Sequence, residues 1–152
     1  MHAPALVLAA FTTAASAAGQ AAVLNNCDSD VYIWTVGDDG ATERGAFKQG
    51  KSWTEDYGSG TREIKVSTDE DALANSSTQT SLVYGINNDE SVSYDLYNVF
   101  GSPFNSLVVE VDDDECDDIQ WEDGNPPGGI QYRYCSADAS VTLVLCGEQT
   151  EE

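Results

Sequence analysis

The chain has 152 residues, and 27 Asp and Glu against 6 Lys and Arg give it a formal net charge of −21 at pH 7. This length suits one domain with a hydrophobic core and is too short for two. A negative charge of this size repels nucleic acids and anionic membrane surfaces. It therefore excludes both as partners and leaves cationic groups, multivalent cations and neutral polymers.

The first part of the chain, residues 1–18, is predicted to be a secretory signal peptide. An apolar stretch over residues 3–11 precedes small residues, with two small-x-small cleavage sites ending at Ala17 and Ala18. This stretch is far shorter than the roughly 20 residues that a membrane-spanning helix needs, and no later run is long enough. We expect a secreted, extracellular protein with no membrane insertion and one mature domain over residues 19–152.

Apolar residues in the rest of the chain recur with a period of two, which indicates β-strands. Turn residues bound eight such segments, at 21–25, 31–36, 62–67, 81–86, 91–96, 107–111, 130–135 and 141–145. The fourth and fifth segments flank a four-residue polar loop, which predicts an antiparallel hairpin. Residues 69–75 have the best helical pattern, but a loop is the more typical structure there. We predict an all-β sandwich of about 8–10 short antiparallel strands.

The four cysteines all lie in the predicted mature domain, at Cys27, Cys116, Cys135 and Cys146. An even number of cysteines in a small secreted domain predicts two disulfides, and the spacing leaves three pairings open. A zinc site is the competing interpretation. It would need a C-x-x-C pair or histidine ligands, and the only histidine is His2, within the predicted signal peptide. We expect two disulfides, no metal and no cofactor.

The same composition argues against catalysis. Without a mature histidine or a free thiol, the domain has no Ser-His or Cys-His nucleophile. The glycine-rich segment 124–129 contains two prolines and does not lead into a helix, so it is not a phosphate-binding loop. A carboxylate pair of the glycosidase kind stays open, but with so many acidic residues some pair is inevitable. We expect no enzymatic activity.

Two polar loops carry candidate sites. Asn75 begins the only N-glycosylation sequon, Asn75-Ser76-Ser77, and we expect it to be exposed and to carry a glycan. Residues 112–118 read DDDECDD. This run either binds Ca²⁺ or is a solvated loop whose charges discourage pairing between sheet edges, and the sequence does not decide between them.

Aromatic residues are candidates for stacking against sugars. Trp34 lies on an alternating strand and is predicted to be in the core, whereas Trp53 and Trp121 lie in turn-rich sequence and are expected to be exposed. Tyr132 and Tyr134 share one strand face, so both should be buried or both exposed.

Several segments resemble a known family. Residues 25–34, NNCDSDVYIW, resemble the first strands of thaumatin-like proteins, and residues 94–101, YDLYNVFG, resemble their Tyr-Asp-Val-Ser-x-Val-x-Gly stretch. The block from Cys116 through GNPPGG to Cys135, and the terminal LVLC, are similar to the fungal Bys family of small secreted thaumatin-like (yeast-phase-specific) proteins. The similarity extends from about Val23 to Cys146. It implies a two-sheet β-sandwich, a fungal source and a secreted or wall-associated protein.

The resemblance also implies details of the site. It suggests that Cys27 pairs with Cys146, as terminal strands do in thaumatin-like folds, which leaves Cys116 with Cys135. Asp95 falls on one acidic position of the thaumatin cleft, but Phe100 occupies the next acidic position. The acidic cleft is therefore not reproduced, which argues against the glucanase activity attributed to some thaumatins.

We therefore expect a secreted, non-catalytic fungal interaction protein, either a host-directed effector or a cell-surface protein. The alternatives are a module that binds cell-wall β-glucan and a weak thaumatin-type endo-β-glucanase. Asp95, Trp53 and Trp121 are the candidate ligand-binding residues. The partner would be a host or cell-wall component, such as a polysaccharide, and its identity does not follow from the sequence.

Overall fold

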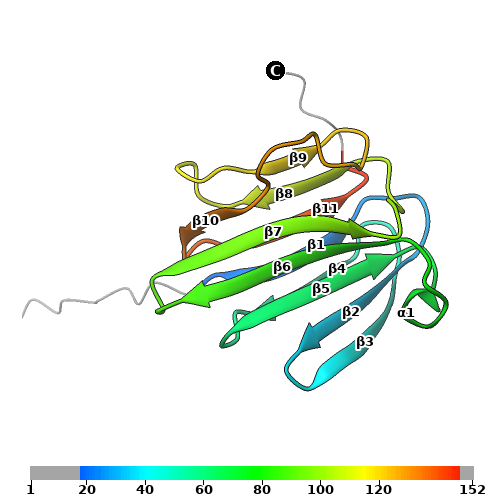
Figure 1. Ribbon diagram of the computed structural model, residues 1–152, viewed down its shortest axis with the longest axis horizontal. Coiled ribbons are helices and arrows are strands. Elements are labelled where there is room, and N and C mark those ends of the chain that lie inside the picture. The colour runs from blue at the N-terminus through cyan, green and yellow to red at the C-terminus, as the bar shows by residue number, and fades with distance from the viewer. Residues whose placement is uncertain (1–17, 148–152) are drawn as a thin grey trace, which may run out of the picture.

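A computed structural model describes residues 18–147 as two packed β-sheets (Figure 1). The predicted signal peptide, apart from Ala18, lies outside these residues. The elements are β1 Gln20–Asn25, β2 Val31–Gly37, β3 Gly40–Phe47, β4 Ser52–Asp56, β5 Thr61–Ser67, α1 Ala72–Asn75, β6 Gln79–Asn87, β7 Ser91–Val99, β8 Leu107–Val111, β9 Ile119–Trp121, β10 Arg133–Ser136 and β11 Val141–Leu145.

The two sheets have five and six strands. The five-stranded sheet has the order β4-β1-β11-β8-β9, and the six-stranded sheet has the order β10-β7-β6-β5-β2-β3. The all-β sandwich that the periodicity predicts is confirmed, but the expectation of antiparallel pairing throughout is wrong at one place. Strands β1 and β11 pair in parallel, with Val23 opposite Leu143. A parallel pair needs a long connection, and here the rest of the domain supplies it.

The strands that the periodicity missed lie at sheet edges. β3, β4 and β9 each have one strand neighbour. An edge strand with much of its surface in water needs no apolar alternation, and β3, with the sequence GATERGAF, has none. β10 begins at Arg133 rather than at residue 130, and Ile130 before it is 80% exposed.

The predicted hairpin is confirmed as β6 and β7, paired from Gln79 opposite Val99 to Asn87 opposite Ser91. Asn88 and Asp89, at φ 50° and 57°, form a type I′ turn that the Glu90 N–H to Asn87 carbonyl bond closes. Within the polar loop that follows β5, α1 is a single helical turn of four residues. No helix in residues 18–147 is long and apolar enough to cross a membrane.

The core lies between the sheets, where alternate side chains of both meet. Its largest fully buried members are Trp121, Tyr84, Tyr94, Ile33, Ile64 and Leu82. Buried hydroxyls need partners, and they have them. The Tyr84 hydroxyl donates to Glu55 Oε1 at 2.7 Å, and the Tyr94 hydroxyl donates to the Asp117 carbonyl at 2.6 Å. The first bond connects the edge strand β4 to the core, and the second connects the acidic loop to it.

Both disulfides border the core: Cys27 and Cys135 belong to it, and Cys116 and Cys146 pack against it. Cys27 bonds Cys146 with Cα atoms 5.0 Å apart, and Cys116 bonds Cys135 with Cα atoms 5.7 Å apart. This is the pairing that the family resemblance implies. The first bond joins the segments that follow the parallel strands β1 and β11. The second joins the acidic loop to β10.

Candidate functional site

The candidate residues from the sequence do not form one site. Trp53 lies on β4, at an edge of the five-stranded sheet, whereas Asp95 lies on β7 of the other sheet. Trp53 is partly buried: the Arg44 guanidinium lies 4.8 Å from its ring centre, and the Phe47 ring contacts its edge at 6.3 Å between centres. Trp53 is therefore a packing residue rather than an exposed platform.

The expected exposure of Trp121 is wrong, since the residue is only 1% exposed. Strand β9 pairs Trp121 with Leu107, which places the indole in the core, and its Nε1 donates to Gln131 Oε1 at 2.9 Å. Trp34 is 5% exposed, as predicted, although it alternates with the inward-facing Ile33 and so lies on the outer side of its sheet.

An exposed row of side chains lies on the outer face of the β7–β10 edge. We call Tyr97, Ile130, Tyr132 and Tyr134 the tyrosine row; they are 37%, 80%, 50% and 72% exposed. The expectation that Tyr132 and Tyr134 share one state is confirmed, and that state is exposure. Their orientation follows from strand alternation, because Tyr94 and Leu96 of β7 and Cys135 of β10 point into the core.

Asp95 borders a groove beside this row. The groove has a volume of about 400 Å³ and is lined by Asp95, Tyr97, Tyr132 and Ile130, with an edge of Trp121 and with Pro126. Asp95 is half-buried, and its Oδ1 accepts the Leu96 N–H at 2.8 Å. Asp95 and Trp121 thus come together as predicted candidates, while the tyrosines supply the exposed rings.

Tyr97 is held by a small polar network on the same face. Its hydroxyl donates to Glu63 Oε1, and Lys65 Nζ lies 2.7 Å from the same oxygen. Partial burial opposes ionisation of Glu63, but the hydrogen bonds from Lys65 and Tyr97 outweigh it and lower the pKa of the carboxyl. Burial and the bond to Glu63 raise the pKa of Tyr97. Glu63 therefore stays ionised and fixes the phenol.

The segment carrying Ile130 and Tyr132 is anchored through Gly124. The Gly124 carbonyl accepts the Asn98 side-chain N–H at 2.8 Å and lies 2.7 Å from the Ser102 hydroxyl. Gly124 has φ 73°, and a Cβ there would lie 1.8 Å from the Phe104 carbonyl oxygen. Only glycine fits this position. The bonds fix one end of the 124–132 segment against β7, and the Cys116–Cys135 bond fixes the other.

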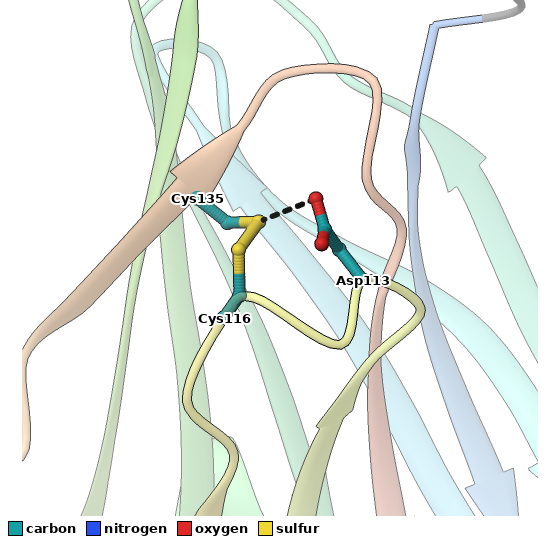
Figure 2. Close-up of side chains that lie close together, drawn as sticks. All are labelled: Asp113, Cys116 and Cys135. Atoms are coloured by element: carbon teal, nitrogen blue, oxygen red, sulfur yellow. Dashed lines mark hydrogen bonds between the residues drawn. A yellow bond between two sulfur atoms is a disulfide. The ribbon is translucent and has the colours of Figure 1, made fainter.

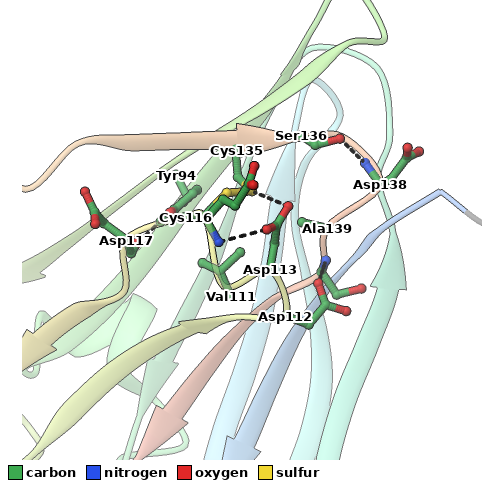
Figure 3. The surroundings of a disulfide bond; sticks show 12 residues. Tyr94, Val111, Asp112, Asp113, Cys116, Asp117, Cys135, Ser136, Asp138 and Ala139 are labelled. Atoms are coloured by element: carbon green, nitrogen blue, oxygen red, sulfur yellow. Dashed lines mark hydrogen bonds between the residues drawn. A yellow bond between two sulfur atoms is a disulfide. The ribbon is translucent and has the colours of Figure 1, made fainter.

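The acidic run 112–118 supplies hydrogen-bond acceptors to its own surroundings. Asp112 accepts the Ser140 N–H, Asp113 accepts the Glu115 N–H at 3.0 Å, and Asp118 accepts the Val111 N–H at 2.9 Å. Figure 3 shows the Asp117 carboxylate directed away from the Asp113 carboxylate. The carboxylates therefore cap loop amides instead of converging on one point. This arrangement favours the loop interpretation over calcium.

One carboxylate of this run, that of Asp113, faces the Cys116–Cys135 disulfide, with Oδ2 3.7 Å from Cys135 Sγ (Figure 2). In the described part of the chain these residues form the one group of three Cys, His or acidic residues close enough to share an ion. Both sulfurs are bonded to each other, however, so neither is a thiolate and neither carries a proton to donate. The group is a carboxylate packed on a disulfide.

The comparisons with known proteins place the chain. The family model for Bys1, the Blastomyces yeast-phase-specific protein, matches residues 8–147. The chain belongs to the Bys1 family. An antigenic thaumatin-like protein from the fungus Arthroderma benhamiae is 27% identical over 157 residues, an alignment that covers 91% of this chain and 78% of the relative.

Solved structures show the fold of this Bys1 protein to be thaumatin-like. The protein elicitor MoHrip2 from Magnaporthe oryzae superposes with a TM-score of 0.70 at 22% identity, covering 86% of this chain and all of that one (100%). The thaumatin-like xylanase inhibitor TLXI gives a TM-score of 0.58 at 13% identity, covering 84% of this chain and 99% of that one. The resemblance drawn from the sequence is therefore confirmed.

The sequon of this Bys1 protein lies at the end of α1. Asn75 is exposed, as expected, and Ser76 after it has φ 60°. The Asn75 Nδ2 donates to Asp69 Oδ2 at 2.9 Å, and the Ser77 hydroxyl donates to the same oxygen at 2.6 Å. A glycan on Nδ2 would leave one N–H, enough to keep the bond to Asp69.

Tyr97 and Ile130 are site residues outside the candidate ligand-binding set of Asp95, Trp53 and Trp121. Ile130 begins the segment 130–135, which reads as a strand, and Tyr97 directly follows the segment 91–96. Tyr97 offered one signal: it alternates with Leu96, which the pattern places in the core, so it has to face outward. Ile130 offered none.

Proposed function

We propose that this Bys1 protein acts outside the fungal cell as a non-catalytic recognition protein, with the tyrosine row as its contact surface for another protein. The observation that carries the proposal is the row itself. Single exposed apolar residues are ordinary, but Tyr97, Ile130 and Tyr132 line one groove, and Tyr134, two residues after Tyr132, is 72% exposed. Tyrosine is enriched at protein interfaces because it buries a large area at a small entropic cost.

An extracellular site of action has two supports. The apolar leader over residues 1–18 has the composition of a signal peptide. All four cysteines are bonded, and disulfides of this kind persist in oxidising compartments. On this proposal Asn75 carries an N-linked glycan, which glycosidase treatment of the secreted protein would remove with a loss of mass. An Asn75→Gln variant should show no such loss.

Absence of catalysis is the second part of the proposal. Glycoside hydrolysis requires two carboxyl groups about 5–5.5 Å or 6.5–9.5 Å apart across the substrate. The aromatic groove is lined by one carboxylate, that of Asp95. The two similar structures are named as an elicitor and an inhibitor, which is in keeping with a scaffold used for recognition and with a role directed at a host.

A photo-crosslinking residue tests the contact surface. We would place benzoylphenylalanine at position 134, or at position 73 as a control, since Leu73 is 38% exposed on α1 and away from the row. After illumination in host extracellular fluid, position 134 should give a discrete protein adduct that Tyr132→Ala abolishes, and position 73 should not. Equal adducts from both positions, or none from position 134, would contradict the proposal.

Binding of a wall polysaccharide is a second candidate, favoured by the tyrosine rings beside Asp95 in an open groove. Sedimentation with insoluble β-glucan, chitin and cellulose tests it, using Tyr132→Ala/Tyr134→Ala as the comparison. Retention that depends on the two tyrosines would support this candidate. Release of reducing sugar that Asp95→Asn abolishes would instead show an endoglucanase and overturn the non-catalytic proposal.

A further inference from the structure

The groove between Tyr97 and Tyr132 contains a negative charge without a counter-charge. We infer that it receives a cationic side chain, an arginine or lysine, from the partner protein, with Asp95 as counter-ion and the tyrosine rings as walls. The inference rests on the proposed function, because it names the chemistry of the protein that meets the tyrosine row.

Asp95 differs from Glu63, which lies near it on the same sheet, in having no basic partner among residues 18–147. In the described part of the chain the ion pairs are Glu63 with Lys65 and Glu55 with Arg62. Asp95, although half-buried, accepts a backbone N–H and has no Lys or Arg nitrogen within 4.0 Å. A carboxylate partly withdrawn from water gains most from a cation that arrives with a ligand.

Two basic residues, Lys65 and Arg133, lie near the groove, but neither forms an ion pair with Asp95. Lys65 Nζ lies 2.7 Å from Glu63 Oε1 and therefore neutralises the Glu63 carboxylate instead of Asp95. Arg133 turns back along its own segment, donating from Nη1 to the carbonyls of Ile130 at 2.7 Å and Tyr132 at 3.0 Å. On the other side of Pro126 a second hollow is lined by Glu122 and Asp123. Around the groove, four acidic side chains (Asp95, Glu63, Glu122 and Asp123) therefore lie near two basic ones (Lys65 and Arg133).

Aromatic side chains line the groove. Cations are attracted to the face of an aromatic ring within about 6 Å of its centre. Residues 18–147 already contain two such contacts, with Arg44 over Trp53 at 4.8 Å and Lys65 beside Tyr97 at 5.9 Å. The groove volume of about 400 Å³ leaves room for a long side chain between the rings.

These features favour a basic protein segment over a neutral sugar as the ligand of the groove. Sugar hydroxyls would hydrogen-bond to Asp95 but would bring no positive charge to it. A guanidinium compensates the charge and stacks on the rings at once. The net charge of −21 adds long-range attraction, which raises the association rate for a basic partner.

The test uses acetylated tetra-arginine amide as the probe and tetra-citrulline amide as its neutral isostere. Titration calorimetry with the whole mature protein should give binding of tetra-arginine and none of tetra-citrulline. Asp95→Asn should weaken tetra-arginine binding about tenfold or more, the size expected for a charge-assisted contact. Asn keeps an oxygen for the Leu96 N–H, so the fold is preserved. Tyr132→Ala should weaken binding as well.

Asp38→Asn is the matched control, because Asp38 is exposed in the β2–β3 turn and its loss changes the net charge equally. An unchanged affinity in this variant supports a specific site. Equal weakening by Asp38→Asn and Asp95→Asn would reduce the effect to non-specific charge attraction and overturn the inference. Equal binding of tetra-citrulline, or no binding of tetra-arginine, would also overturn it.

The result separates this inference from the proposed function. If crosslinking at position 134 succeeds but tetra-arginine does not bind, the recognition proposal stands and the cation inference falls. If tetra-arginine binds through Asp95 but no protein is crosslinked, the cation site stands and the recognition proposal falls.

Discussion

The two disulfides lie in two regions whose apolar residues differ in exposure to solvent. Near Cys27–Cys146, the paired strands β1 and β11 direct alternate apolar residues into the core, with Val23 and Leu143 both 0% exposed. Within the loop that Cys116–Cys135 closes, Ile130 and Tyr134 are 80% and 72% exposed. Packing explains the hydrophobic residues of the first region. In the second region packing explains the buried Ile119 and Trp121 but not the exposed Ile130 and Tyr134, and these exposed residues carry the functional proposal.

The largest expected effect compares the two disulfides directly. Cys27→Ala/Cys146→Ala should lower the free energy of unfolding by about 4–5 kcal/mol and Cys116→Ala/Cys135→Ala by about 3 kcal/mol, because the bonds span 119 and 19 residues. Urea unfolding of both variants measures the difference. An equal loss from both would show that strain or residual unfolded structure outweighs loop length.

The next effect lies within the loop of the second disulfide. Gly124→Ala should cost about 3 kcal/mol or more, because it adds a clash with a backbone carbonyl to a positive φ. Gly128→Ala, at φ 87° with no atom within 4 Å of the added carbon, should cost about 1–2 kcal/mol from backbone strain alone. Thermal unfolding compares the two. Similar losses would mean that the loop adjusts freely around residue 124.

The tyrosine row should matter little for folding. Tyr132→Ala/Tyr134→Ala is expected to change the unfolding free energy by less than about 0.5 kcal/mol, since both side chains are largely in water. Leu143→Ala, in the terminal region, should cost about 2–5 kcal/mol by creating a cavity. A large loss from the tyrosine variant would mean that the row packs the fold, and would remove the main support for the recognition proposal.

The smallest effect concerns pH. The folded pKa of Glu63 lies below its ordinary value of 4.5, so the network with Lys65 and Tyr97 stabilises the protein above that pH. This contribution is lost as the pH falls through the lower, folded-state pKa. The melting temperature of the wild type should exceed that of Glu63→Gln at pH 7, and the gap should close in acid. A gap independent of pH would show that Glu63 ionisation is not involved.

The sequence predicted the interior of this molecule better than its edges. Strands such as β6 and β8 have one face buried or both, so their apolar pattern reports their structure. β3 lies at an edge of its sheet, where its polar side chains face water. Its sequence therefore lacks the apolar alternation that indicates a strand. No local pattern could reveal that β1 and β11 pair in parallel, because that contact joins residues 120 positions apart, as Ala21 and Val141 do.

In the candidate site, too, local patterns predicted some residues and tertiary contacts determined the others. Asp95 was found through a family motif, but Trp121 was misplaced because its neighbours are turn residues, while its own environment is set by β8 across the sheet. Tyr132 and Tyr134 were correctly linked by alternation. Whether the two side chains are buried or exposed depends on which other segments pack over that face of the sheet, and this is a property of the tertiary structure.

The parallel pair of β1 and β11 has a consequence for biosynthesis. Strand β11 lies between β1 and β8 at the centre of its sheet, so that sheet has a gap until residue 145 has been synthesised. Contacts this distant form late, after the entropy of closing the long loop has been overcome. A chain that emerges from its amino end therefore cannot complete the five-stranded sheet until translation has passed β11. The Cys27–Cys146 bond has to wait equally long, because Cys146 directly follows this last strand, so Cys27 remains a free thiol or pairs elsewhere until then.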